Sequence, residues 1–312
     1  MSAQPRVSVV IPCFNTERYI AATLRTVLAQ TGAALEVIVV DDGSSDGSAA
    51  LVEREFPQVR LIRRANAGVA AARNAGIAAA TGEWIAFCDA DDIWLPGKLA
   101  AQFEAMAAAP GCRMSYTAWH VWVSAEAEPE PGLLQRLADE ASDTQRWAGA
   151  TGWLYPELLL DCVVWTPTVL MHRSVIDEVG VFDTGLRIGE DYDLWLRASR
   201  VTRIERVARP LALYRQHPAS ITRSAPTANY KGRVVQSALA RWGYAGPDGR
   251  RMDEGTVRRM LAKTWSDYAA AQLAAGQRTA ARISVREALR QDAAHGPGWK
   301  LLLRSFLPAR AS

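Results

Sequence analysis

Short apolar runs that alternate with helical stretches are the feature that most limits how this chain can fold. Each run contains β-branched or aromatic residues and is too short to be a stable helix. This alternation predicts an α/β fold in which a mostly parallel central sheet carries helices on both faces. Ligands bind open sheets of this kind beyond the carboxyl ends of the strands. The predicted strands are Val7–Ile11, Leu35–Val40, Val59–Ile62 and Trp84–Cys88, and the helices between them are Glu17–Gln30, Gly47–Glu55 and Gly68–Ala80.

The pattern is less regular farther along the chain. Residues Ser124 to Trp147 are acidic and contain prolines, which indicates an irregular segment. The chain beyond Ala225 has helical character, so we predict a first domain over residues 1–225 and a helical region over 226–312. The other elements expected before that boundary are a helix from about Pro96 to Ala109, a strand over Arg113–Val123, a helix over Trp153–Leu160, a strand over Val163–His172, a helix that begins at Glu190 and a strand that ends near Tyr214.

Composition narrows the class of protein. With 312 residues, of which 49% are hydrophobic, the chain can bury a substantial core. Its apolar stretches are far shorter than the ~20 residues that cross a bilayer, and no secretory signal precedes the first strand. We therefore expect a cytoplasmic protein. Its four cysteines lack paired spacing, so we expect them to be reduced.

Basic residues are concentrated at the C-terminal end. From Tyr230 onward, the chain has 15 Lys and Arg against 6 Asp and Glu. Arginine recurs at every fourth position of a predicted helix, at Arg278, Arg282, Arg286 and Arg290. This ridge predicts either peripheral contact with an anionic membrane or a solvated face of a helical bundle. It lacks interleaved aromatic residues, so we expect no nucleic acid partner.

Acidic residues follow the fourth predicted strand directly. Like charges as close as Asp89, Asp91 and Asp92 destabilise a fold unless a cation or several donors lie between them. The D-x-D spacing of Asp89 and Asp91 directs two carboxylates toward one point. Such oxygen ligands suit Mg²⁺ or Mn²⁺ held together with a substrate diphosphate. Alternatively, Asp92 caps the following helix while the other two are solvated.

Polar groups also follow the first three predicted strands. The first strand leads to Pro12–Asn15, and the second leads to the turn Asp41–Ser48, whose carboxylates and N–H groups suit a polar ring or a ribose. The alternative for this turn is a simple cap of the next helix. After the third strand, Arg73 can bind a base carbonyl or a phosphate with fixed geometry, although a lone Arg more often lies on a solvated helix face.

Two later segments carry further polar groups. The segment GEDYDLWLR places Glu190 and Asp191 in the first turn of a predicted helix, where the helix dipole favours ionised carboxylates. A carboxylate there can accept a proton from an attacking alcohol, but acidic first turns also stabilise many helices without any chemistry. The segment YRQHPASI contains Arg215 and His217. His217 can be a third metal ligand, a diphosphate contact or a structural residue.

The order and separation of these motifs resemble those of the family 2 glycosyltransferases, which have the GT-A fold. The resemblance covers about Val7 to Ser224. It is carried by the segments VSVVIPCFN, VIVVDDGSSDGS, NAGVAAARNAG, GEWIAFCDADDIW, GEDYDLWLR and YRQHPASI.

The resemblance implies roles for particular residues. The implied metal ligands are Asp91 and, in addition, Asp89 and His217. The implied general base is Asp191, beside Glu190. Weaker candidates for contacts to the diphosphate or the acceptor are Trp94 and Arg215. The donor nucleotide is assigned to Pro12, Asn15, Asp42 or less certainly Asp41, Arg73 for the base, and Asp89 for the ribose.

The implied reaction is a single displacement with inversion at the anomeric carbon. It moves a sugar from a nucleoside-diphosphate donor to a hydroxyl of a saccharide or lipid-linked acceptor, as in bacterial cell-surface polysaccharide synthesis. Members of the family diverge in the acceptor region, here about Ser124 to Gly152. The alternative is a catalytically silent nucleotide-sugar-binding or scaffold protein, which would be expected to have lost one of these acids. The absence of a P-loop and of G-x-G-x-x-G argues against ATPases and dinucleotide oxidoreductases.

Overall fold

The computed structural model describes residues 4–124, 126–140, 150–217 and 227–306. The chain divides into two compact units. The first comprises Met1–Leu154 and Cys162–Pro218, and the second comprises Tyr155–Asp161 and Ala219–Ser312. The predicted boundary near residue 225 lies outside the described residues and stays a prediction.

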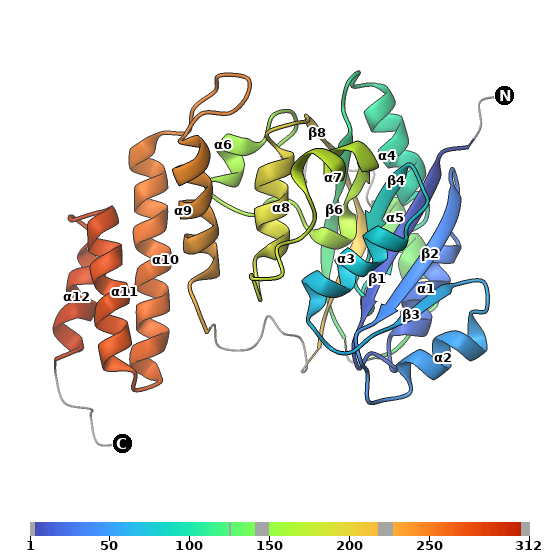
Figure 1. Ribbon diagram of the computed structural model, residues 1–312, viewed down its shortest axis with the longest axis horizontal. Coiled ribbons are helices and arrows are strands. Elements are labelled where there is room, and N and C mark those ends of the chain that lie inside the picture. The colour runs from blue at the N-terminus through green and yellow to red at the C-terminus, as the bar shows by residue number, and fades with distance from the viewer. Residues whose placement is uncertain (1–3, 125, 141–149, 218–226, 307–312) are drawn as a thin grey trace. The chain divides into compact units, whose positions relative to one another are not determined.

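A mixed sheet forms the centre of the first unit (Figure 1). Within the described residues it has eight strands in the order β3-β2-β1-β4-β7-β6-β8-β5. The pairs β1–β2, β1–β4, β2–β3 and β6–β8 are parallel, while β7 and β5 pair antiparallel with their neighbours. The strands are β1 Arg6–Cys13, β2 Ala34–Asp41, β3 Arg60–Arg63, β4 Trp84–Phe87, β5 Ile93–Trp94, β6 Met114–Val123, β7 Leu170–His172 and β8 Ile204–Gln216.

Helices cover both faces of this sheet. Alternate strand residues point to opposite sides, and apolar side chains on each side pack against helices. Val9 and Ile11 of β1 pack with Ile20 and Leu24 of α1 in one apolar cluster. On the other face, β2 packs against Ala72 of α3 in a separate cluster. The helices of this unit are α1 Ile20–Leu28, α2 Ser48–Glu55, α3 Val69–Ala79, α4 Lys98–Ala107, α5 Leu133–Glu140, α7 Arg173–Val179 and α8 Glu190–Ala198. The predicted mostly parallel α/β architecture is confirmed.

The structure differs from the sequence prediction in four places. The predicted strand Val163–His172 is only β7, preceded by the 3₁₀ turn η2 (Thr166–Thr168). Pro167 accounts for this, because it has no N–H for a strand ladder. The segment predicted to be irregular contains α5. The short elements β5 and α7 were not predicted at all.

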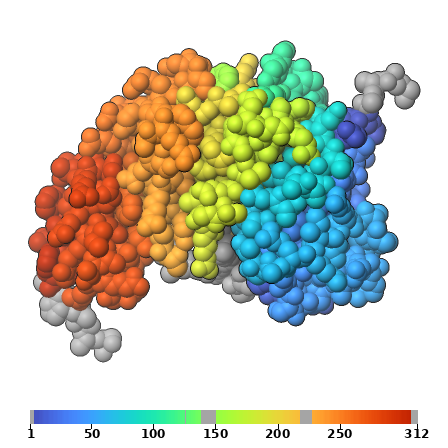
Figure 2. All heavy atoms as spheres, in the orientation of Figure 1, coloured from blue at the N-terminus to red at the C-terminus, as the bar shows by residue number. Residues whose placement is uncertain are grey.

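The second unit is helical, as predicted for the chain after residue 226. Its helices are α6 Tyr155–Leu158, α9 Tyr230–Trp242, α10 Glu254–Ala274, α11 Arg278–Gln291 and α12 Gly296–Arg304. The last three helices share a small core of Ala269, Val285 and Leu301. The part of the chain from α9 onward forms the orange and red surface in Figure 2. The Tyr155 hydroxyl of α6 donates to the Gly243 carbonyl, at 2.7 Å. Across both units, none of the described helices has the length and apolarity to cross a membrane.

Close packing of α3 on β1 depends on Gly76. A Cβ atom at this position would lie 2.3 Å from Val10 Cγ1, well inside van der Waals contact. We therefore expect Gly76→Ala to lower the free energy of unfolding by about 1–3 kcal/mol from overpacking. The helix propensity of alanine would offset at most about 1 kcal/mol of this loss.

Urea denaturation of the single and double variants tests this contact. In a cycle with Val10→Ala, the double variant should be more stable than the sum of the two single losses, since the clashing methyl groups are gone. Simple additivity would show that Gly76 is not limited by Val10.

Candidate functional site

Hydrogen bonds between backbone N–H groups and side chains connect the loops after β1 and β2, and they shape one side of the site. Asn15 follows β1 with a φ of 53°, a left-handed conformation that asparagine tolerates well. Its Oδ1 accepts from the Ser45 N–H at 2.8 Å, and its own N–H donates to Ser44 Oγ at 3.0 Å. Pro12 lies within β1, opposite Val40 of β2. These contacts hold the ends of two parallel strands together.

The adjacent aspartates at the end of β2 have different surroundings. The Asp42 carboxylate accepts from the N–H groups of Ala67 and Gly68, at 3.1 and 2.7 Å, and lies 3.1 Å from Arg64 Nε. Asp42 therefore fixes the entry into α3. Asp41 is also buried, and within the described residues its carboxylate accepts from one N–H, that of Ser44, at 3.3 Å. Of the two, Asp41 has more hydrogen-bonding capacity left for a ligand.

Arg73 of α3 connects two segments that are far apart in the sequence. Its Nη2 donates to Asp89 Oδ1 and its Nη1 to Glu190 Oε1, each at 2.7 Å. The guanidinium also lies over the Phe182 ring, 5.4 Å from its centroid, and the side chain is buried. One arginine thus holds the D-x-D loop after β4 beside the first turn of α8.

Burial and charge act in opposite directions in this cluster. Burial alone would lower the pKa of Arg73, but Asp89, Glu190 and Asp191 together raise that pKa above its ordinary value. Burial raises the pKa of Glu190 to about 7; Asp191 adds to the rise and Arg73 partly offsets it. The cluster therefore contains a carboxyl group that titrates near neutral pH.

Asp191 is held by a contact that the sequence analysis missed. Its Oδ2 accepts from the Thr166 hydroxyl at 2.8 Å, and its Oδ1 accepts from the Tyr192 N–H at 2.7 Å. Thr166 is the first residue of η2, and two buried side chains hold this turn in place by hydrogen bonds to its carbonyls. Trp94 Nε1 donates to the Pro167 carbonyl at 2.8 Å, and Gln102 Nε2 to the Thr168 carbonyl at 2.9 Å. No motif in the sequence points to Thr166, because the contact forms only when η2 and α8 meet.

The three aspartates after β4 each have their own partner. Asp89 is paired with Arg73, as described. Asp91 Oδ2 lies 3.0 Å from His217 Nε2, whose ring packs on Tyr19 with centroids 4.7 Å apart. Burial raises the pKa of Asp91, Asp89 raises it further, and His217 opposes both. Asp92 is fully buried, and its Oδ1 accepts from the Arg215 N–H at 2.8 Å.

Arg215 and Trp94, the weaker candidates for ligand contacts, are buried and have partners within the protein. The Arg215 guanidinium donates to the carbonyls of Asp91, Glu126 and Ala127, and its Nε lies 2.6 Å from the Asp91 oxygen. The indole N–H of Trp94 donates to the Pro167 carbonyl. Both side chains therefore support the site from the interior, and their contact with a diphosphate or an acceptor stays a prediction.

The arrangement fits a divalent metal held partly by substrate. Within the described ranges, no group of three or more His, Cys, Asp or Glu side chains could hold a metal ion by itself. Mg²⁺ typically takes only one or two protein carboxylates and completes its coordination with phosphates and water. Asp91, partnered by His217, and the nearby Asp89 provide that number of carboxylates.

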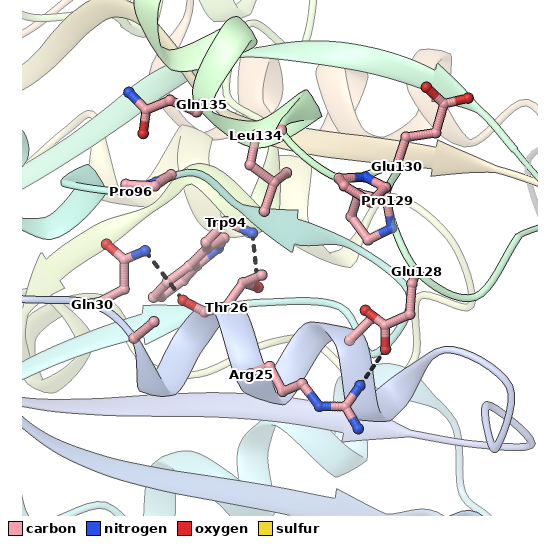
Figure 3. Close-up of a pocket in the computed structure, with 14 residues that line it drawn as sticks. Arg25, Thr26, Gln30, Trp94, Pro96, Glu128, Pro129, Glu130, Leu134 and Gln135 are labelled. Carbon is pink, nitrogen blue, oxygen red and sulfur yellow. Dashed lines mark hydrogen bonds and ion pairs between the residues drawn. The ribbon is translucent and has the colours of Figure 1, made fainter.

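The first unit also contains a cavity that α1 lines on one side (Figure 3). It has a volume of about 470 Å³ and lies between α1 and the segment that runs through Pro129 to Gln135. Arg25 of α1 pairs with Glu128 across it. Of the predicted site residues only Trp94 lines it, so this cavity is distinct from the acidic cluster.

Comparison with known proteins identifies the family. Residues 8–112 match the model of glycosyl transferase family 2, a range that includes the D-x-D motif and Arg73. The match covers about a third of the chain. The family predicted from the motifs is thereby confirmed.

One curated relative has a specific name. The chain is 29% identical over 192 residues to the Escherichia coli "UDP-Glc:alpha-D-GlcNAc-diphosphoundecaprenol beta-1,3-glucosyltransferase WfgD", a match that covers 61% of this chain and 68% of that protein. Other curated relatives are uncharacterized glycosyltransferases. The matches span only 26% to 30% of the length of those from Rickettsia bellii, Rickettsia felis, Rickettsia conorii and Nostoc, and 67% of the one from Rickettsia typhi.

Solved structures share the fold. S. aureus TarS 1–349 in complex with UDP-GlcNAc has a TM-score of 0.63 at 17% identity, over 96% of this chain and 89% of that chain. The mannosyltransferase PcManGT from Pyrobaculum calidifontis, in complex with GDP-Man and Mn²⁺, has a TM-score of 0.50 at 19% identity, over 97% and 80% of the two chains. At these identities the likeness establishes the GT-A fold alone.

Because the pKa of Glu190 is raised, the stability of the folded chain should depend on pH. The carboxyl group of Glu190 has a pKa of about 7 in the folded chain and its ordinary pKa of 4.5 in the unfolded chain. The unfolded chain therefore loses its proton first, and stability falls as pH rises between these values. The loss is on the order of 3 kcal/mol. We expect Glu190→Gln to flatten this part of a pH series of urea denaturation curves, while Glu104→Gln, an exposed acid on α4, should leave the slope unchanged. Parallel slopes for the parent and Glu190→Gln would contradict the assignment.

Proposed function

We propose that this chain is a glycosyltransferase that moves a sugar from a nucleoside-diphosphate donor to a hydroxyl group, with inversion at the anomeric carbon. The observation that carries the proposal is the double ion pair of Arg73. It holds the D-x-D loop and the Glu190–Asp191 turn around one buried cation, with both bonds at 2.7 Å. Family membership makes sugar transfer the favoured chemistry for such a cluster.

At the donor end, the loops after β1, β2 and β4 would bind the nucleotide. Asp41 is suited to accept a hydrogen bond from the base, while Asp42 keeps the start of α3 in position for it. Asp89 would contact the ribose with the carboxylate oxygen that Arg73 leaves available. Arg73 would then act mainly by orienting Asp89, since its two terminal nitrogens already donate to carboxylates.

At the acceptor end, Asp191 would take the proton from the attacking hydroxyl. Thr166 and the Tyr192 N–H each occupy one lone pair of its carboxylate, which fixes the direction of the remaining ones. Glu190 would stay beside Arg73 and maintain the geometry of this turn. The proton is removed on one face of the sugar while the diphosphate leaves on the other, which gives inversion.

Asp91 and Asp89 would hold Mg²⁺ or Mn²⁺, with His217 keeping Asp91 oriented. When bound, the metal neutralises charge that develops on the departing diphosphate. The proposal is supported by the Mn²⁺ in the Pyrobaculum mannosyltransferase.

The names of related proteins favour particular substrate classes. TarS is described with UDP-GlcNAc and the Pyrobaculum enzyme with GDP-Man, which supports a nucleotide-sugar donor. The name of WfgD specifies a diphosphoundecaprenol-linked acceptor, which supports a lipid-linked saccharide acceptor and a role in bacterial polysaccharide synthesis. Such an acceptor would place the protein at the inner face of the membrane.

Replacement of the proposed base separates catalysis from donor binding. We expect Asp191→Asn to lower kcat by about 10²- to 10⁴-fold while the affinity for the donor nucleotide stays close to that of the parent. Asp193→Asn is the matched control, because Asp193 lies on the same helix but pairs with Arg197 at 2.8 Å. Donor turnover and nucleotide affinity are measured for both variants.

The same experiment tests the alternative function. A parent protein that binds nucleotide sugars but transfers no sugar would favour a silent binding or scaffold protein. A parental turnover rate in Asp191→Asn would show that Asp191 is not the base.

Replacement of Asp91 tests the proposed metal contact. Nucleoside diphosphate at ~100 times its dissociation constant should stabilise the parent by about 2.7 kcal/mol in the presence of Mn²⁺. We expect Asp91→Asn to lose most of this stabilisation, whereas Asp183→Asn, an exposed acid, should keep it. Equal thermal shifts with and without Mn²⁺ in the parent would contradict a metal-dependent site.

A further inference from the structure

The outer surface of α12 has an exposed apolar stripe. Trp299, Leu303 and Phe306 are spaced by four and three positions, so they lie on one side of the helix and its C-terminal end. They are 50%, 68% and 63% exposed. Contiguous apolar side chains of this size on a surface indicate a contact with a partner.

This stripe is separate from the side of α12 that packs in the bundle. Leu301 faces the small core formed with α10 and α11, and Ser305 is also buried. Because positions 301 and 305 lie opposite positions 299 and 303 on a helical wheel, the bundle cannot cover the stripe. The helix therefore has two apolar sides, and only one of them is used within the described residues.

Contacts with α11 fix the stripe in place. Arg282 Nη2 donates to the Ser305 carbonyl at 3.2 Å, and its guanidinium lies 4.5 Å from the centroid of the Phe306 ring. The Trp299 indole N–H donates to the Ala293 carbonyl at 2.9 Å. These contacts leave the ring surfaces exposed but limit their motion.

Basic residues lie next to the stripe. Lys300 and Arg304 follow Trp299 and Leu303 by one position each, and both are exposed. The sequence from Ala293 to Ser312 contains three Lys and Arg and no Asp or Glu. An apolar strip bordered by cations is complementary to a surface with a hydrocarbon interior and anionic headgroups.

We propose that this α12 surface, formed by Trp299, Lys300, Leu303, Arg304 and Phe306, binds the surface of an anionic lipid membrane. The three apolar side chains enter the interface between headgroups and acyl chains, while Lys300 and Arg304 contact lipid phosphates. Three apolar residues and two charges give reversible binding rather than permanent insertion.

Two other occupants fit the surface less well. A second copy of the chain, paired about a two-fold axis, would bring Lys300 and Arg304 close to their own counterparts. A nucleic acid would use the basic residues and the aromatic rings, but the most exposed member of the stripe is Leu303, which neither pairs with phosphate nor stacks on bases.

The exposed residues of α12 replace the arginine ridge of α11 as the surface expected to contact a membrane. The arginine ridge on α11 is not a uniform cationic face, because Arg282 binds the end of α12 and Arg290 pairs with Glu287 at 3.2 Å. The surface with both apolar and cationic character is on the following helix. It is independent of whether the first unit transfers sugars.

Vesicle sedimentation of the full chain tests the proposal. We expect the parent to sediment at low salt with vesicles of phosphatidylcholine mixed with phosphatidylglycerol, and not with phosphatidylcholine alone. The double variant L303S/F306S should bind about tenfold or more weakly, from the loss of apolar burial. K300Q/R304Q should lose about fivefold per charge, which corresponds to about 1 kcal/mol each.

Controls separate this result from loss of folding or activity. Val123→Ser removes an apolar side chain that is 74% exposed in the first unit, and it should bind vesicles as the parent does. Donor turnover should be unchanged in the α12 variants. K300Q/R304Q should unfold at the temperature of the parent, and L303S/F306S should stay folded with at most a small loss of stability from the contact between Phe306 and Arg282. The proposal is overturned if the parent does not bind anionic vesicles at low salt or if L303S/F306S binds as tightly as the parent. It is also overturned if the stripe variants only convert a dimer to a monomer, since that result would identify an interface between copies.

Discussion

The buried ion pairs of Arg73 are the interaction on which the rest of the site depends. Asp89 and Glu190 lie on segments separated by 100 residues of chain, and Arg73 from a third element brings them together. Loss of one partner from a buried ion pair leaves an uncompensated charge, which typically costs about 3–5 kcal/mol. The same arginine explains why an acidic loop and an acidic helix end can coexist in the interior of one unit.

Charge compensation is divided among several partners rather than supplied by one cation. Asp89 has Arg73, Asp91 has His217, and Asp92 has a backbone N–H from Arg215. The pKa of Asp91 is nevertheless raised, because burial and Asp89 outweigh His217. Burial also raises the pKa of Asp92 and of Glu190, so these partners compensate the buried carboxylates of the site only in part.

Much of this could be predicted from the sequence because the signals are local. Hydrophobic periodicity located the strands around Val9 and Ile85 and the helix that contains Arg73, and polar residues at strand ends marked the loops of the site. Thr166 could not be predicted, since its bond to Asp191 depends on where a 3₁₀ turn meets a helix. The surroundings of Arg215 and Trp94 could not be predicted for the same reason: their residue types suggest ligand contacts, and their positions in the sheet bury them.

The sequence by itself determined the order of the first four strands and the helices between them, the family resemblance, and the set of acids available for chemistry. These properties follow from residue type and spacing along the chain. Only the tertiary structure decided which acid pairs with which cation, which aspartate after β2 keeps capacity for a ligand, and which side of α12 stays exposed. Each of these depends on distances between segments that are remote in sequence, and such distances are set by packing rather than by local pattern.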